Sequence, residues 1–241
     1  MAIALRTSGT QPVAATNCDT TISTISDDCL IGGWSSDNST HGTYTFESPF
    51  STAEVDNTQS WNGQSFVGSL GIETSSDTVK RLTDSTNAYV GLVAAFSGVD
   101  TTTPRDTTTQ TASSGAGTAS QTATLTFTTA TANAMVVFLV AWDEDQGVSP
   151  TLTLNDGGAG LTWSSINSLE SASPFRNVKL YYAIKPTAGS ISVYVSRGAT
   201  GGYGCAMLAL RPASSLPVIT AQPTNQTGYV GSTATFTVTA V

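Results

Sequence analysis

The stretch Val178-Lys-Leu-Tyr-Tyr-Ala-Ile184, followed by Lys185-Pro-Thr-Ala-Gly189 and Ile191-Ser-Val-Tyr-Val195, decides the fold class of this chain. Apolar residues take every second position on both sides of a segment that contains Pro and Gly, a pattern typical of half-buried strands joined by a turn. Residues 123–127 and 151–154 alternate in the same way, and segments with helical periodicity are scarce. The sequence therefore predicts an all-β protein built from antiparallel strands.

The chain also contains an internal repeat, which emerges when its two halves are compared across residue 105. The matched pairs are residues 30–37 with 138–145, Trp61 with Trp163 (each after a turn), 66–72 with 178–184, and 89–96 with 203–210. Duplication of one sandwich module explains these matches, with insertions and deletions placed in surface loops. Four aromatic residues recur at matched places, and we expect them in the core: Trp34, Trp142, Tyr89 and Tyr203.

Composition excludes two classes of partner. The 241 residues carry a net charge of −8 with only nine Lys and Arg, whereas nucleic-acid binding depends on clustered basic side chains. No apolar run approaches the roughly 18 residues of a membrane-spanning helix, and the first residues lack the pattern of a signal peptide. We therefore expect neither a nucleic-acid partner nor a membrane span, and synthesis in the cytoplasm.

Composition shifts divide the chain into four parts. We predict a β-sandwich domain at 1–103, a Thr/Ser/Gly-rich linker or edge segment at 104–121, a second sandwich at 122–213, and a further unit that begins at 214. Cys205 lies in an apolar run and is expected in the core as a free thiol. Cys18 and Cys29 can face each other across a hairpin, so their pairing stays open.

The chain offers little catalytic chemistry. His41 is the only histidine and lies in a loop-like stretch without a nearby nucleophile motif, so we predict neither a catalytic residue nor a cofactor. Acidic residues after the strand that ends at Trp142 favour a solvated loop; Asp143, Asp145 and Asp156 are a weak candidate for a cation site. Glycoside hydrolysis would require Glu144 or Asp145 to face a second carboxylate.

The C-terminal residues resemble a known family. Ile219-Thr-Ala-Gln-Pro-Thr-Asn-Gln-Thr and Val230-Gly-Ser-Thr-Ala-Thr-Phe-Thr-Val look like the first two strands of a bacterial or phage immunoglobulin-like domain. The resemblance covers only residues 218–241 and lacks the later strands, so it implies the start of such a domain.

The rest of the chain is similar to repeats of phage virion proteins. The resemblance rests on a strand that ends in Ala95-Phe-Ser-Gly-Val-Asp100, followed by Thr101-Thr-Thr-Pro-Arg-Asp106. It spans most of residues 20–212 and is looser in the first half, where Gly32, Gly33 and residues 40–59 depart from the pattern. It implies two tandem antiparallel β-sandwich domains of jelly-roll-like type, in a structural part of a virus particle and without chemistry.

Two functions follow as expectations. The first is a non-enzymatic virion protein that decorates the capsid surface as a homo-oligomer, with a trimer favoured by the resemblance and the major capsid protein or another virion component as partner. In this reading an N-terminal arm with Ala2, Ile3, Leu5 and Arg6 anchors the protein. The alternative is a carbohydrate-binding or receptor-binding module of a tail fibre or adhesin. Its distinguishing feature would be an exposed Trp or Tyr with polar neighbours in a groove.

Overall fold

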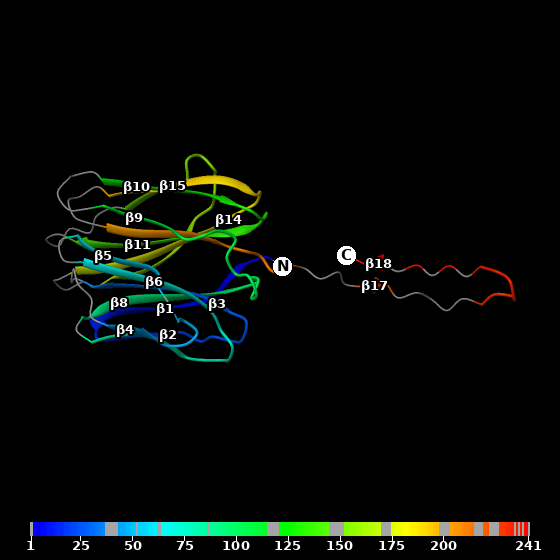
Figure 1. The fold of residues 1–241 in the computed structure, drawn as a ribbon, viewed down its shortest axis with the longest axis horizontal. Coiled ribbons are helices and arrows are strands. Elements are labelled where there is room, and N and C mark those ends of the chain that lie inside the picture. Colours follow the sequence, from blue (N-terminus) through cyan, green and yellow to red (C-terminus); the bar gives the residue numbers. More distant parts are fainter. Residues whose placement is uncertain are drawn as a thin grey trace.

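The computed structural model is all-β, as the alternating pattern predicts. It describes residues 2–36, 43–51, 53–61, 64–85, 87–114, 121–144, 152–169, 175–197, 203–214, 219–221, 227–233, 235, 237 and 239–240. These residues form antiparallel sheets and no helix. In Figure 1 the sheets lie one above another as layers, with a C-terminal hairpin drawn apart from them.

The first module contains two sheets. The inner sheet has five strands in the order β1 (Ala4–Ala15), β8 (Tyr89–Ser97), β3 (Cys29–Ser36), β6 (Gln64–Ile72) and β5 (Ala53–Trp61). The outer sheet has three strands in the order β2 (Asn17–Thr21), β7 (Val79–Asp84) and β4 (Tyr44–Phe46). Because strands adjacent in space are mostly distant in sequence, this is the two-sheet winding of a jelly roll.

The second module repeats this order strand for strand. Its inner sheet runs β9 (Gln110–Ser114), β16 (Tyr203–Leu210), β11 (Ala134–Glu144), β14 (Phe175–Lys185) and β13 (Ser164–Leu169). Its outer sheet runs β10 (Gln121–Thr129), β15 (Gly189–Arg197) and β12 (Leu152–Asn155). Each strand of the first module therefore has its counterpart eight strands later. Three of the four matched sequence pairs fall on counterpart strands, namely β3 with β11, β6 with β14 and β8 with β16.

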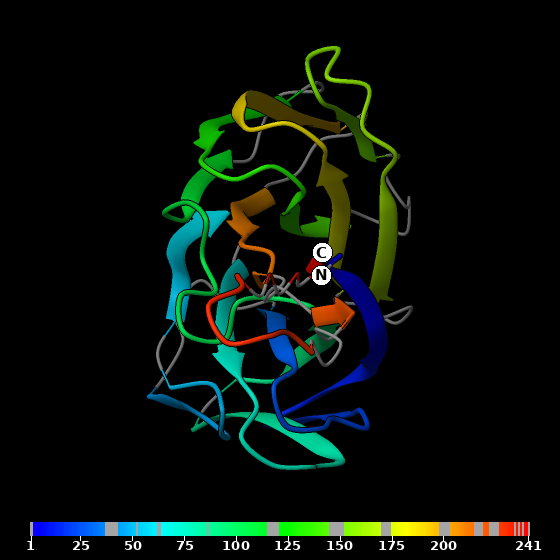
Figure 2. The ribbon, with the colours of Figure 1, turned by 90° about the vertical axis from the view of Figure 1, so that its right-hand side faces the viewer.

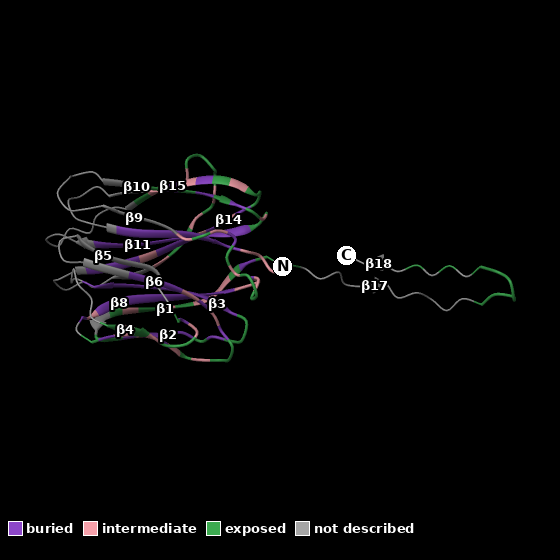
Figure 3. Cartoon of the chain, viewed as in Figure 1, coloured by how far each residue is buried: buried purple, intermediate pink, exposed green. Residues whose placement is uncertain are grey.

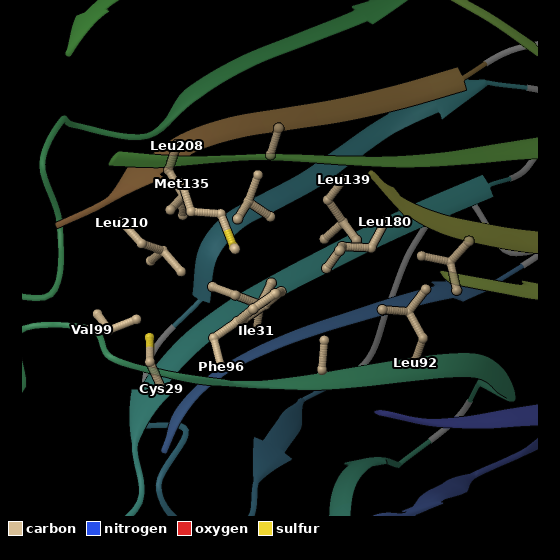
Figure 4. Packing of buried hydrophobic residues seen from close by; sticks show 14 of the residues in the cluster. Cys29, Ile31, Leu92, Phe96, Val99, Met135, Leu139, Leu180, Leu208 and Leu210 are labelled. Atoms are coloured by element: carbon tan, nitrogen blue, oxygen red, sulfur yellow. The ribbon is translucent and has the colours of Figure 1, made fainter. Parts of the chain in front are cut away.

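The two inner sheets pack face to face around one apolar layer. Figure 4 shows Ile31, Leu92 and Phe96 of the first module against Leu139 and Leu180 of the second, all of them buried. β1 lies beside β13 and β9 lies beside β5. Since β9 and β13 are the counterparts of β1 and β5, each module presents the same surface to the other, as at a twofold interface between identical subunits.

Two glycines permit this close approach at β3. A Cβ on Gly33 would lie 2.7 Å from Cδ1 of Leu139, on the facing sheet. A Cβ on Gly32 would lie 2.2 Å from the indole ring of Trp34. The departure of Gly32 and Gly33 from the virion-repeat pattern therefore has a steric reason: one glycine admits the other module, and its neighbour admits the Trp34 ring.

Each module also has a second apolar core, between its inner and outer sheets. In the first module Trp34, Phe50 and Leu82 belong to this core, and in the second Phe138 and Trp142 do. Inner strands such as β8 are thus covered on both faces, which is why the sequence 89–96 is apolar at almost every position. In Figure 3 the buried segments follow these inner strands.

The connection between the modules is fastened to the end of β16. Asp100 accepts hydrogen bonds from the backbone amides of Thr102 (2.9 Å) and Thr103 (3.0 Å), which shape the turn. The buried carboxylate of Asp106 accepts from the backbone amides of Ala130 (2.6 Å) and Thr131 (3.1 Å), between β10 and β11 of the second module. Segment 104–121 thus contains the second part of this connection and the edge strand β9, and the motif that carries the virion resemblance joins the modules.

The predicted anchoring arm is instead part of the sandwich. Ile3 is only 4% exposed and belongs to the central layer, and Leu5 packs against that layer. Arg6 donates from Nε to both carboxylate oxygens of Asp28 (2.8 Å) and from Nη2 to the carbonyl of Ser23. Ala2 is exposed but directly precedes this paired segment. An edge strand that must pair with β8 to bury Ile3 is not a free arm, so this prediction is wrong.

The three cysteines are free and buried. Cys29 lies in the central layer between the modules, whereas Cys18 lies in the core between the inner and outer sheets of the first module. The inner sheet separates the two thiols, so the pairing left open by the sequence does not form. Burial raises the pKa of Cys29 to about 12 and raises that of Cys18 further.

At the C-terminal end, β17 (Ile219–Ala221) pairs antiparallel with β18 (Thr239–Ala240). Tyr229 and Val230, in the connection between them, are almost fully exposed. Figure 2, turned by 90° from Figure 1, shows this red and orange segment in front of the sandwich layers. A pair of strands is consistent with the start of an immunoglobulin-like domain, which stays a prediction.

Replacing Gly33 with Val tests the shared core. The added side chain must displace Leu139, and overpacking of this kind costs about 1–3 kcal/mol of unfolding free energy. We expect both modules to lose stability together, in one transition, when unfolding is followed by denaturant titration. Thr128→Ala, at an exposed position of β10, is the control and should change stability by less than about 0.5 kcal/mol. Two separate transitions, with only the first shifted, would contradict the shared core.

Replacing Ile3 with Ala tests the integration of the N-terminal strand. Deleting most of a buried isoleucine side chain costs about 2–5 kcal/mol, and a side chain on a free arm would cost almost nothing. Thermal unfolding of this variant and of Ser8→Ala, an exposed position on the same strand, measures the difference. Equal melting temperatures for the two variants would restore the free arm.

Candidate functional site

The four aromatic residues expected in the core divide into two groups. Trp34 and Tyr89 are fully buried and Trp142 is 4% exposed, so their rings serve packing. The hydroxyl of Tyr89 donates to Oδ2 of Asp84 over 2.9 Å. Tyr203 is the first residue of β16 and pairs with Trp142, but its side chain lies outside the described part of the structure.

The match between Trp61 and Trp163 is wrong. Trp61 is the last residue of β5, whereas Trp163 directly precedes β13, the counterpart of β5. The two tryptophans therefore lie at opposite ends of equivalent strands. In the first module the connection equivalent to that of Trp163 contains Phe50, which is 2% exposed and packs edge-on against Trp34 at 5.4 Å. Trp163 is only half-buried, so recurrence no longer argues for a pure packing role.

Trp163 closes a glycine-rich loop that joins β12 to β13, at residues 156–163. Gly157, Gly158 and Gly160 have φ values of +65°, +84° and +68°, a backbone region that favours glycine. Asp156 organises the loop, because its carboxylate accepts from the backbone amides of Leu161 (2.7 Å) and Gly158 (3.2 Å). Side chain and backbone thus hold one defined conformation.

A surface depression of about 410 Å³ lies within this loop. Its described lining consists of Leu154, Asn155, Asp156, Gly158, Gly160, Leu161 and Trp163. Leu154, Leu161 and Trp163 also pack against the core between the sheets of the second module, so the apolar wall is held from behind. Polar groups of Asn155 and Asp156 stand beside this wall. The carbohydrate-binding alternative calls for an exposed Trp or Tyr in a groove, whereas the ring beside this hollow is half-buried.

Asp156 is ionised at neutral pH. Burial acts to raise the pKa of this carboxyl, but hydrogen bonds from backbone amides, that of Leu161 foremost, lower it below its ordinary value. The indole N–H of Trp163 faces the same carboxylate and contributes to the lowering without reaching full hydrogen-bond geometry. The depression therefore presents one negative charge whose oxygens already hold the loop in shape.

The proposed cation ligands do not assemble among the described residues. Asp156 follows the outer-sheet strand β12, and Asp143 belongs to the inner-sheet strand β11. The side chains of Asp143 and Glu144, and all of Asp145 and His41, lie outside the described part of the structure. Within that part no three metal-ligating side chains come together.

The described residues also form no helix of the length and apolar character that a membrane crossing requires.

A second polar cluster, buried at one end of the first module, was not predicted. Lys80 is 1% exposed, and its Nζ lies 2.6 Å from Oε2 of Glu73 and 2.8 Å from Oδ2 of Asp77. The same ammonium donates to the carbonyl of Ser48 over 2.8 Å. Thr24 donates to Glu73 over 2.9 Å, so the cluster connects the loop segments of residues 22–28, 47–51 and 73–78. All three ammonium protons have acceptors, which suits a structural cross-connection.

The sequence offered one signal for this cluster, although it was missed. Lys80, Leu82 and Asp84 occupy the inward positions of β7, and alternation within the strand would have placed them on one face. A lysine in such a position predicts a buried counter-charge, because an unpaired buried ammonium is strongly unfavourable. The charged partners of Lys80, which are Glu73 and Asp77, lie in a loop, and the alternation of residues within a strand does not predict which loop residues contact it.

The pH dependence of stability tests the pairing of Asp77 with Lys80. Hydrogen bonding to Lys80 lowers the pKa of Asp77 in the folded state, so this carboxylate stabilises the fold above its unfolded pKa of about 4. That stabilisation is lost as the pH falls from about 4 through the lower folded-state pKa. We expect the melting temperature of Asp77→Asn to lie below that of the wild-type protein at pH 7. In acid the two melting temperatures should converge. A constant gap over this range would contradict the pairing.

No family model matches the chain, and neither a curated protein nor a solved structure matches it.

Proposed function

We propose that this chain is a non-enzymatic structural protein of a virus particle, which decorates the capsid surface. The observation that carries the proposal is the fusion of two jelly rolls around one continuous core. Jelly rolls are a recurrent architecture of viral capsid and lectin domains. The shared apolar layer fixes the position of one module relative to the other. A protein that acts as a spacer on a surface requires such rigidity.

The exterior supports the same proposal. Exposed hydroxyl groups line the outer sheet of the second module, where Thr124, Thr126 and Thr128 alternate along β10 and Oγ1 of Thr126 lies 2.7 Å from Oγ of Ser192. Only 11% of all residues are charged, and the net charge is −8. A weakly acidic, hydroxyl-rich surface suits display at high local density, because it limits association between neighbouring copies.

The N-terminal residues do not form a separate arm for attachment, because they belong to the first module. With Ile3 in the central layer, the surfaces left for binding a major capsid protein or another virion component are those of the modules and of the C-terminal segment. We expect the protein to bind as a symmetric homo-oligomer, and the resemblance to phage decoration and fibre proteins favours a trimer.

Adding the purified chain back to virus particles that were assembled without it tests the proposal. Saturable co-sedimentation at a fixed number of copies per particle, with new density at symmetry-related positions in a reconstructed map, is the expected outcome. A chain that ends at residue 213 is the matched variant, since it keeps both modules and lacks β17 and β18. Binding by this variant assigns attachment to the modules, and its loss assigns attachment to the C-terminal segment. Absence of the full chain from purified native particles would reject the proposal.

A further inference from the structure

We propose that the loop of residues 156–163, together with Asn155 at the end of β12, binds an uncharged saccharide, with the ring of Trp163 as the stacking surface. The site is the depression of about 410 Å³ in the second module, on the yellow-green loop at the top of Figure 2. This inference goes beyond decoration, because it concerns what the protein itself recognises.

The aromatic surface is held in place. Trp163 packs against the core of the second module on one side and is half-buried overall, so part of its indole is available to a ligand. Such a ring offers an apolar face at little entropic cost, since packing already restricts its side-chain torsions. The equivalent connection of the first module is shorter, and its Phe50 is buried against Trp34 and Phe46. The hollow is thus a property of the second module's longer loop.

Polar groups beside the ring match hydroxyl groups. Oδ1 of Asn155 accepts from the amide of Gly157 (2.8 Å), which orients the exposed side chain and leaves its NH2 group as a donor. The ionised carboxylate of Asp156 accepts two backbone hydrogen bonds and retains further acceptor capacity. A Cβ placed on Gly158 or Gly160 would meet no atom within 4 Å, so a ligand can approach the backbone there.

Charge selects the class of ligand. The described lining contains no Lys or Arg, which disfavours a phosphate, sulfate or carboxylate group. Its one carboxylate is engaged with backbone amides, which disfavours a cation. A ligand that combines an apolar ring face with several hydroxyl groups satisfies both the indole and the polar groups. The volume lies within the range of roughly 300–1,000 Å³ found for small-molecule sites.

The experiment screens the purified full chain against an array of neutral and acidic glycans, and then measures Kd for the best neutral saccharide by ligand-observed NMR titration. Trp163→Leu keeps an apolar side chain against the core but removes the flat ring, and we expect binding at least about tenfold weaker. Trp163→Phe restores a ring and should recover most of the affinity. Phe50→Leu, at the equivalent place in the first module, is the matched control and should leave Kd unchanged.

Several outcomes would overturn the inference. One is the absence of saccharide binding at millimolar concentrations, and another is binding that Trp163→Leu leaves intact while thermal unfolding shows that the variant is folded. A preference for acidic glycans, or binding that a chelator abolishes, would also contradict it. Because the assay uses the isolated chain, its failure leaves decoration untouched. In turn, a chain that binds saccharide but never particles would retain this site and lose the proposed function.

Discussion

The apolar layer between the two inner sheets is the constraint on which the rest of the structure depends. Each inner sheet is covered on its other face by the outer sheet of the same module. The shared layer therefore joins the two sandwiches into one folded unit. Burial of both faces explains why the central strands β8, β11 and β16 of these sheets are almost continuously apolar. It also explains the glycine at position 33, where Leu139 occupies the space of a side chain. The N-terminal segment is also held by this layer, through Ile3.

Repetition of one winding has freed the two modules to diverge where the shared layer is not involved. The connection between β4 and β5 is short, and its Phe50 is buried. The connection between β12 and β13 is longer and glycine-rich, and its Trp163 is half-buried. One module buries a lysine among carboxylates, and the other carries a neutral face of threonine and serine. Divergence of loops on a constant set of strands is the usual route by which a fold acquires a binding site.

The motif that suggested a virion protein has a structural role of its own. Asp100 shapes the turn after β8, and Asp106 caps the backbone at residues 130 and 131 of the next module. These hydrogen bonds fix the connection between the two modules of this chain. The resemblance therefore reports how the modules are linked, and the virion assignment stays a proposal supported by architecture and surface.

Local pattern alone determined the alternating and the apolar strands, their antiparallel class and the repeat, because alternation and apolar runs reflect how each of these strands is buried on one or both faces. Three matched pairs fell on counterpart strands for this reason, and Trp34 and Trp142 could be placed in the core. Tertiary structure decided the remainder. Which sheet covers which, and hence the separation of Cys18 from Cys29, depends on contacts between residues far apart in sequence. The burial of Ile3 also depends on such contacts, with β8 and with the second module, so the sequence alone suggested an arm. The exposure of Trp163 is set by a loop, which the sequence pattern does not describe.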